Sequence, residues 1–167
     1  WAAARRQADA VLAADAVPPG TRFYALLAAG RMRARLGEDD ATPLLDEALE
    51  IAQGSASIAF LGPTRAARAE AAWLAGDPEQ AVVEARAAYD LALERGLHWS
   101  LPELATWRWT CGDLPDPPRN LTGPYGLLMR GDWATATTAW DAIGYRYEGA
   151  RARLASTDET ALRDALA

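Results

Sequence analysis

Lysine is absent from this 167-residue chain, and cysteine and histidine occur once each. Without lysine the chain cannot form a Walker-type phosphate-binding loop or a lysine Schiff base. Because Cys111 has no partner for an internal disulfide, we expect a reducing compartment, the cytoplasm. We expect His98 to be structural or solvated, since one histidine and one cysteine fall short of a zinc site.

Strand-forming sequence and long apolar runs are scarce as well. No segment alternates with a period of two, and no run of about 18 apolar residues predicts a membrane span. The net charge of −6 at pH 7 disfavours direct binding of nucleic acid, whose phosphates attract basic surfaces. Arginines alternate with acids along most predicted helices, which is typical of solvated helix faces.

Sequence signatures of catalysis are missing too. No Gly-x-Ser-x-Gly elbow occurs, and no Gly-x-Gly-x-x-Gly follows a strand. The acid pairs Asp39–Asp40 and Asp46–Glu50 are interpreted as surface acids near helix starts, where the helix dipole favours negative charge. We therefore expect no catalytic residue, no cofactor and no metal ion, and we do not expect this chain to be an enzyme.

The residues that are abundant predict helices, since alanine occurs 39 times. Glycines fall where helices are expected to end, at Gly37, Gly54, Gly76, Gly96, Gly112, Gly131 and Gly144. The sequence predicts ten helices, at about 2–16, 21–36, 43–53, 59–75, 78–95, 101–111, 124–130, 133–143, 146–154 and 159–166. The expected N-caps are Thr21, Thr42, Asp77 and Ser100. The segment 113–120, with three prolines, is expected to be a loop.

Two predicted helices, 59–75 and 78–95, meet at the corner Gly76-Asp77-Pro78 and are expected to form an antiparallel hairpin. Small residues on one stripe of each helix allow close packing. These residues are Ala66, Ala69 and Ala72 on the first helix and Ala81, Ala85, Ala88 and Ala92 on the second. An apolar face stays open at Leu74, Val82, Tyr89 and Leu93. A hairpin that cannot complete its own core is typical of a stacked repeat.

The corner recurs, because Gly76-Asp77 and Gly131-Asp132 are each followed by the pattern x-x-x-Ala. This Gly-Asp-x-x-x-Ala pattern resembles the turn between the two helices of a tetratricopeptide repeat. The resemblance implies an all-α fold of antiparallel hairpins, stacked as a tetratricopeptide-like right-handed superhelical array over residues 1–167. The corners are 55 residues apart, so the array is expected to be irregular.

A second resemblance covers most of the chain. The stretches that carry it are "ARLGEDDATPLLDEALEIA", "GPTRAARAEAAWLAGDPEQAVVEARAAYDLAL", "LPELATWRWTCGDLPDPP" and "PYGLLMRGDWATATTAWDAIGYRYEGARARL". They resemble the C-terminal helical region of bacterial LuxR-type ATPase transcriptional regulators, and related regions accompany some ATPase-linked adenylate cyclases. The resemblance implies a non-catalytic regulatory module. Because the chain begins at Trp1 and ends within a helical pattern, we interpret it as a segment of a longer protein.

Five aromatic residues form the candidate partner or ligand surface: Trp107, Trp109, Tyr125, Trp133 and Trp140. Aromatic rings are enriched at binding surfaces, although they also fill the space between alanine-lined helices. The expected partner is a protein, a peptide or a small inducer. The alternatives are a homodimer contact in a self-association or spacer array, or a regulatory region of an adenylate cyclase.

Overall fold

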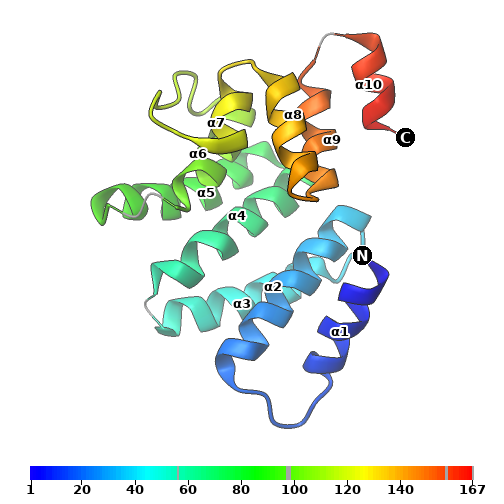
Figure 1. Ribbon diagram of the computed structural model, residues 1–167. Helices are drawn as coiled ribbons and strands as arrows, with labels where there is room; N and C mark the ends of the chain where they lie inside the picture. Colours follow the sequence, from blue (N-terminus) through cyan, green and yellow to red (C-terminus); the bar gives the residue numbers. More distant parts are fainter. Residues whose placement is uncertain (56, 97–98, 157, 167) are drawn as a thin grey trace. The chain divides into compact units, whose positions relative to one another are not determined.

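The computed structural model describes residues 1–167 except 56, 97–98, 157 and 167, and these described residues form ten α-helices without a β-strand. The helices are α1 (Ala2–Leu12), α2 (Pro19–Leu36), α3 (Ala41–Ser55), α4 (Ile58–Leu74), α5 (Pro78–Glu94), α6 (Leu101–Thr110), α7 (Gly123–Met129), α8 (Trp133–Ala142), α9 (Arg146–Leu154) and α10 (Glu159–Ala165) (Figure 1). The all-α prediction is therefore confirmed.

The chain divides into two compact units, residues 1–114 and 115–167, where the sequence predicts one continuous array. The boundary lies in the predicted loop 113–120, which is non-helical as expected. Pro115, Pro117 and Pro118 lack backbone N–H groups and disfavour helical conformation in the residues before them. These prolines explain why no helix crosses the boundary.

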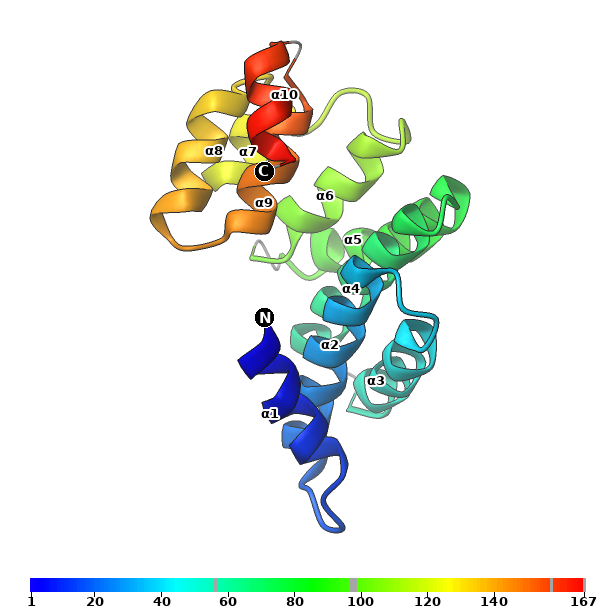
Figure 2. The same cartoon turned by 90° about the vertical axis from the view of Figure 1, so that its right-hand side faces the viewer.

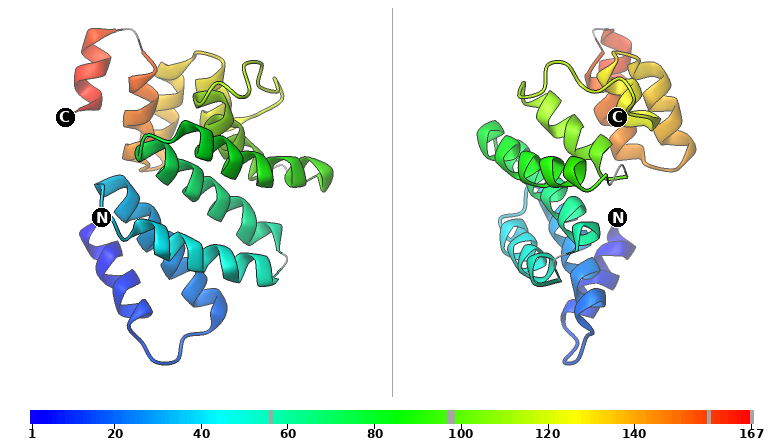
Figure 3. Two further views of the ribbon diagram at one scale, coloured as in Figure 1. Left: turned by 180° about the vertical axis from the view of Figure 1, so that it is seen from behind. Right: turned by 90° about the vertical axis from the view of Figure 1, so that its left-hand side faces the viewer.

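Helix packing in the first unit follows two patterns. Each helix from α1 to α6 packs on the next one in sequence, and α4 and α5 lie side by side in Figure 1 and in the left view of Figure 3. Helices two apart also make contact, because α4 packs against both α2 and α6. The three alternate helices α2, α4 and α6 therefore form a continuous row.

Alanine lines the contact between α4 and α5 as the stripe pattern predicts. Ala81, Ala85, Ala88 and Ala92 are no more than 2% exposed. On α4, Ala66 and Ala69 are equally buried, whereas Ala72 is partly exposed. A second core, between α2 and α3, contains Phe23, Leu26, Ala48 and Ala52.

Gly30 marks a close crossing of α2 and α3. A Cβ atom at this position would lie 2.7 Å from Cδ2 of Leu45, closer than packed carbon atoms tolerate. Packing therefore favours glycine at this position, which offsets its cost of about 1 kcal/mol in helix propensity.

The repeated Gly-Asp corner has the same local structure at both positions. Gly76 and Gly131 are left-handed, with φ of 82° and 83°. The carboxylates of Asp77 and Asp132 cap the following helices, accepting hydrogen bonds from the backbone N–H groups of Gln80 (2.9 Å) and Thr135 (3.2 Å). The prediction of Asp77 as an N-cap is confirmed.

Sequential packing joins the helices of the second unit, α7 with α8, α8 with α9 and α9 with α10. Figure 2 shows α8 and α9 as neighbours. The Thr137 hydroxyl of α8 donates to the carbonyl of Gly149 in α9 at 3.4 Å. The buried apolar residues of this unit are Leu121, Leu128, Met129, Ala136, Trp140, Ala152 and Ala161.

Several predicted helix ends are wrong. α2 begins at Pro19, so Thr21 lies inside the helix, because proline is favoured at the first helical position. α3 begins at Ala41 and includes Thr42. Pro43 is tolerated in the first turn, because the first four N–H groups of a helix have no acceptor within the helix and the missing N–H of proline costs no hydrogen bond there. Gly54 also lies within α3.

The first and sixth helices also differ from the prediction at one end. α1 ends at Leu12 rather than at residue 16, because alanine propensity alone does not extend a helix beyond its packed face. Ser100 precedes α6 in the N-cap position, but its side chain does not cap the helix. Its backbone is already in the helical region, with φ −91° and ψ −17°, whereas a capping serine is usually extended.

Candidate functional site

A buried carboxylate on α4, Glu70, links the helices of the row α2, α4 and α6. Its side chain is 1% exposed and accepts hydrogen bonds from Nε (2.7 Å) and Nη2 (3.1 Å) of Arg35. Nε of Arg31 lies 3.1 Å from the second oxygen of Glu70, and Nη2 of Arg31 donates to Glu103 of α6 at 2.6 Å. Arg31 therefore bridges α4 and α6.

A second buried carboxylate, Glu84 of α5, is held by two arginines of α4. Its side chain is 3% exposed, and it accepts hydrogen bonds from Arg65 and from Nε of Arg68 (2.8 Å). Nε2 of Gln80 donates to the same carboxylate at 3.1 Å. Arg68 also donates to Asp46 of α3, so one guanidinium connects three successive helices.

The charge state of Arg68 follows from these contacts. Burial lowers the pKa of its guanidinium, but the hydrogen bonds to Asp46 and Glu84 outweigh burial and leave the pKa raised. Arg68 is therefore a permanent cation. Isolated buried charges are costly, and this pairing makes the burial of Glu84 tolerable.

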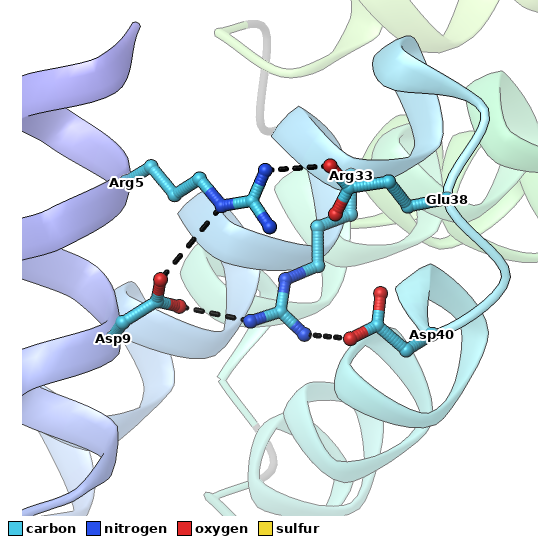
Figure 4. A network of polar contacts seen from close by, with 5 residues as sticks. All are labelled: Arg5, Asp9, Arg33, Glu38 and Asp40. Atoms are coloured by element: carbon cyan, nitrogen blue, oxygen red, sulfur yellow. Dashed lines mark hydrogen bonds and ion pairs between the residues drawn. The ribbon is translucent and has the colours of Figure 1, made fainter.

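A third ionic network joins α1 and α2 to the turn before α3 (Figure 4). Nη1 of Arg5 donates to Glu38 at 2.5 Å, and Nη2 of Arg33 donates to Asp9 at 2.9 Å. Arg33 also donates to Asp40. Among the described residues, many arginines that the alternation pattern assigns to solvated faces thus connect different helices.

Two adjoining hollows lie beside the turns α2–α3 and α4–α5 and share Thr42, Ala71 and Ala75 in their walls. The first has a volume of about 190 Å³ and is completed by Leu45, Arg68, Ala72, Asp77, Gln80 and Glu84. The second has a volume of about 390 Å³ and is completed by Ala34, Gly37, Glu38, Asp39, Ala41 and Leu74. We name the two hollows together the turn groove.

The turn groove combines an apolar floor with carboxylates. Alanine and leucine are seven of its fifteen lining residues, and the lining also contains four acids and one basic residue, Arg68. Within the described part of the chain, Asp39 and Asp77 form no ion pair, while Glu38 and Glu84 are paired with arginines. The geometry suits a ligand that carries both apolar surface and positive charge.

The predicted aromatic surface is divided between the two units. Trp107 and Trp109 belong to the first unit, and Tyr125, Trp133 and Trp140 belong to the second. In the first unit Trp107 is 1% exposed and packs against Trp73 with ring centroids 5.8 Å apart. Trp109 is half-buried, so its ring is the more accessible of this pair.

In the second unit the predicted aromatics form a small cluster. The ring of Trp140 is 6% exposed and packs edge-on against Tyr125 at 4.7 Å. Tyr145, which is 55% exposed, extends this cluster toward solvent at 5.7 Å from Trp140. Trp133 is half-buried. Trp107 and Trp140 therefore contribute to the cores of their units, and Trp109, Tyr125 and Trp133 offer only partial surface.

The environment of Cys111 does not activate its thiol. Burial, together with the negative charge of Asp113, raises the pKa of the Cys111 thiol, so the thiol stays protonated near neutral pH. His98 lies outside the described residues. The described residues contain no group of three potential metal ligands, and no described helix is both long and apolar enough to cross a membrane.

Sequence reasoning missed the buried acids and the turn groove. A signal for Glu84 was present, because it lies three residues after Ala81 and four before Ala88, on the same helix stripe. An acid on an apolar stripe indicates a paired carboxylate rather than a solvated one. The groove had no comparable signal, since it joins residues of helices α2 to α5.

Fold and site together define an all-helical protein with alternate-helix packing and internal ion pairs. The known proteins add no further definition: no protein-family model, curated protein or solved structure that was compared with this chain matches it.

Proposed function

We propose that this chain is a non-catalytic helical-repeat module that binds a protein, a peptide or a small inducer. The observation that carries the proposal is the contact of alternate helices, α2 with α4 and α4 with α6, in addition to hairpin contacts. This pattern supports a tetratricopeptide-like stack, because such repeats pack equivalent helices side by side. Stacked hairpins present extended surfaces to partners without needing a catalytic centre.

The regulatory context of the proposal rests on the resemblance to LuxR-type ATPase transcriptional regulators. In such a protein, a partner regulates the output only if it binds one arrangement of the full-length chain more tightly than another. A cytoplasmic location is part of the same proposal. A related regulatory region of an ATPase-linked adenylate cyclase is the alternative context.

The experiment is a thermal-shift screen of the 167-residue chain against peptides and small metabolites, followed by assays of the full-length protein. We expect a compound that raises the melting temperature of the chain to change ATP hydrolysis or DNA affinity of the full-length protein. Binding without any change in either output would contradict the regulatory role.

Self-association is a second candidate function, favoured by exposed apolar side chains in the second unit. Ile143 is 58% exposed and Leu154 is 49% exposed, and Tyr145 lies between them in sequence. Light scattering over a range of concentrations tests this candidate. A monomer at every concentration would exclude a homodimer or a self-assembling spacer.

A further inference from the structure

The size and lining of the turn groove indicate what kind of partner fits it. The volume of its smaller hollow is below the range of about 300–1,000 Å³ that is usual for pockets that bind drug-sized ligands. The volume of its larger hollow is at the low end of that range. Two small hollows with shared walls suit alternate side chains of an extended segment, which lie on one face of it, better than one compact molecule. Ala72 and Ala75 line the smaller hollow, and Leu74 lines the larger one, so each hollow offers apolar contact.

The charge around the groove indicates the sign of the charge that a partner should carry. Arg68 is already held by Asp46 and Glu84, and it therefore attracts a further anion only weakly. Asp39 and Asp77 are exposed and form no ion pair with any described residue, although one oxygen of Asp77 caps α5. When Arg5 and Arg65 are counted with the carboxylates that they hold, the surroundings of the groove remain negative.

We propose that the turn groove binds a basic peptide segment of a partner protein, in which arginine or lysine alternates with apolar residues. The apolar side chains enter the two hollows, and the cations meet Asp39 and Asp77 at the rim. This inference rests on the proposed function and deepens it, since it names the chemistry of the partner and places it at the turns between helices.

The test measures fluorescence anisotropy of a short fluorescein-labelled peptide in which arginine alternates with leucine, mixed with the full 167-residue chain. One control peptide carries glutamate in place of arginine, and another carries serine in place of leucine. In about 0.15 M salt, where distant charges are screened, we expect the arginine–leucine peptide to bind at least about tenfold more tightly than either control. Equal binding of all three peptides, or no binding of the first, would overturn the proposal.

Variants then locate the binding. The double variant Asp39→Asn with Asp77→Asn should weaken binding by about three- to tenfold, because each exposed ion pair contributes up to about 1 kcal/mol. Asparagine caps helices about as well as aspartate, so α5 is retained. Ala75→Leu should also weaken binding, because residue 75 lines both hollows.

The matched control is Asp132→Asn, which removes one charge from the same Gly-Asp corner in the second unit. Binding should be unchanged in this variant, and an equal loss would show nonspecific attraction to an acidic protein. If the double variant does not fold, as judged by circular dichroism, Asp39→Asn alone replaces it, since Asp39 lies in an exposed turn. Failure of all peptides, while the screen still finds a regulatory ligand, would reject the groove and leave the proposed function intact.

Discussion

The two units use the same Gly-Asp corner but build different packing around it. In the first unit the corner joins two helices of 17 residues, and α4 contacts helices two positions away in both directions. In the second unit it joins helices of 7 and 10 residues. A local turn signal therefore specifies a hairpin, whereas the packing beyond the corner differs between the units.

The units also differ in how they place charge. The first unit buries Glu70 and Glu84 among arginines of neighbouring helices. In the second unit the pair Arg153–Asp141 has side chains that are 25% and 40% exposed. Because water screens exposed pairs, the ion pairs of Glu70 and Glu84 should contribute far more to stability than the pair Arg153–Asp141, although the second unit also buries one carboxylate, Glu148.

Removing one carboxylate in each unit is the strongest test of this difference. Glu84→Ala leaves Arg65 and Arg68 without their buried partner and should destabilise the first unit by about 3–5 kcal/mol. Asp141→Ala should cost the second unit less than about 1 kcal/mol. Hydrogen–deuterium exchange of peptides from each unit measures both values. Equal losses would show that burial does not distinguish the two pairs.

Substitution of two buried glycines should have the opposite result, with the larger loss of stability in the second unit. At Gly126 in α7 a Cβ would lie 2.1 Å from the backbone oxygen of Leu121, whereas at Gly30 it would meet the side chain of Leu45. We expect Gly126→Ala to destabilise the second unit by about 3 kcal/mol, because the backbone of Leu121 cannot move aside easily. Gly30→Ala should cost only about 1–2 kcal/mol, because the Leu45 side chain can relax and alanine favours the helix. Urea unfolding of each variant measures the losses, and a larger loss at Gly30 would contradict this reasoning.

The shared corner predicts equal effects in the two units. Asp77→Ala and Asp132→Ala each remove one N-cap hydrogen bond and should each cost about 1 kcal/mol. Thermal unfolding, monitored in each unit by hydrogen–deuterium exchange, measures the two losses of stability. If only one substitution destabilises its helix, the corners are not equivalent despite their common sequence.

The smallest effect concerns acid stability of the first unit. Burial raises the pKa of Asp113, but hydrogen bonds from Arg108 and Arg86 outweigh it and leave the pKa below its usual value of 3.8. The stabilisation is therefore complete above pH 3.8 and is lost as pH falls through the lower folded pKa.

The measurement compares Asp113→Asn with the wild type during acid titration. Near neutral pH the variant should be less stable by under about 1 kcal/mol, and the difference should vanish in acid. Asp116→Asn, at an exposed position of the second unit, is the matched control for the loss of one negative charge. A difference that stays constant with pH would exclude titration of Asp113 as the cause.

Much of the local structure was predictable from single residues. Six of the seven glycines that were expected to end helices have positive φ. The prediction for Gly54 is wrong, because α3 continues to Ser55. Asp77 was identified as a cap because proline and a helical stripe follow it. The predicted N-caps Thr21 and Thr42 failed because proline within the first helical turn moved each helix start upstream.

The candidate site was less predictable. An aromatic ring in a sequence is compatible with burial and with binding, and the structure assigns Trp107 and Trp140 to cores. Thr42, Ala75 and Asp77 form one groove although their local patterns are unrelated. No pattern within one helix reports such a junction, because its walls come from different hairpins.

By itself, the sequence determined the helices, their glycine stops and the alanine stripe that brings α4 against α5, because these depend on backbone conformation and side-chain size within a few neighbouring residues. Only the tertiary structure decided the division at the proline loop, the burial of Glu70 and Glu84 and the position of the turn groove. The physical reason is that solvent exclusion and ion pairing depend on which distant helices pack together.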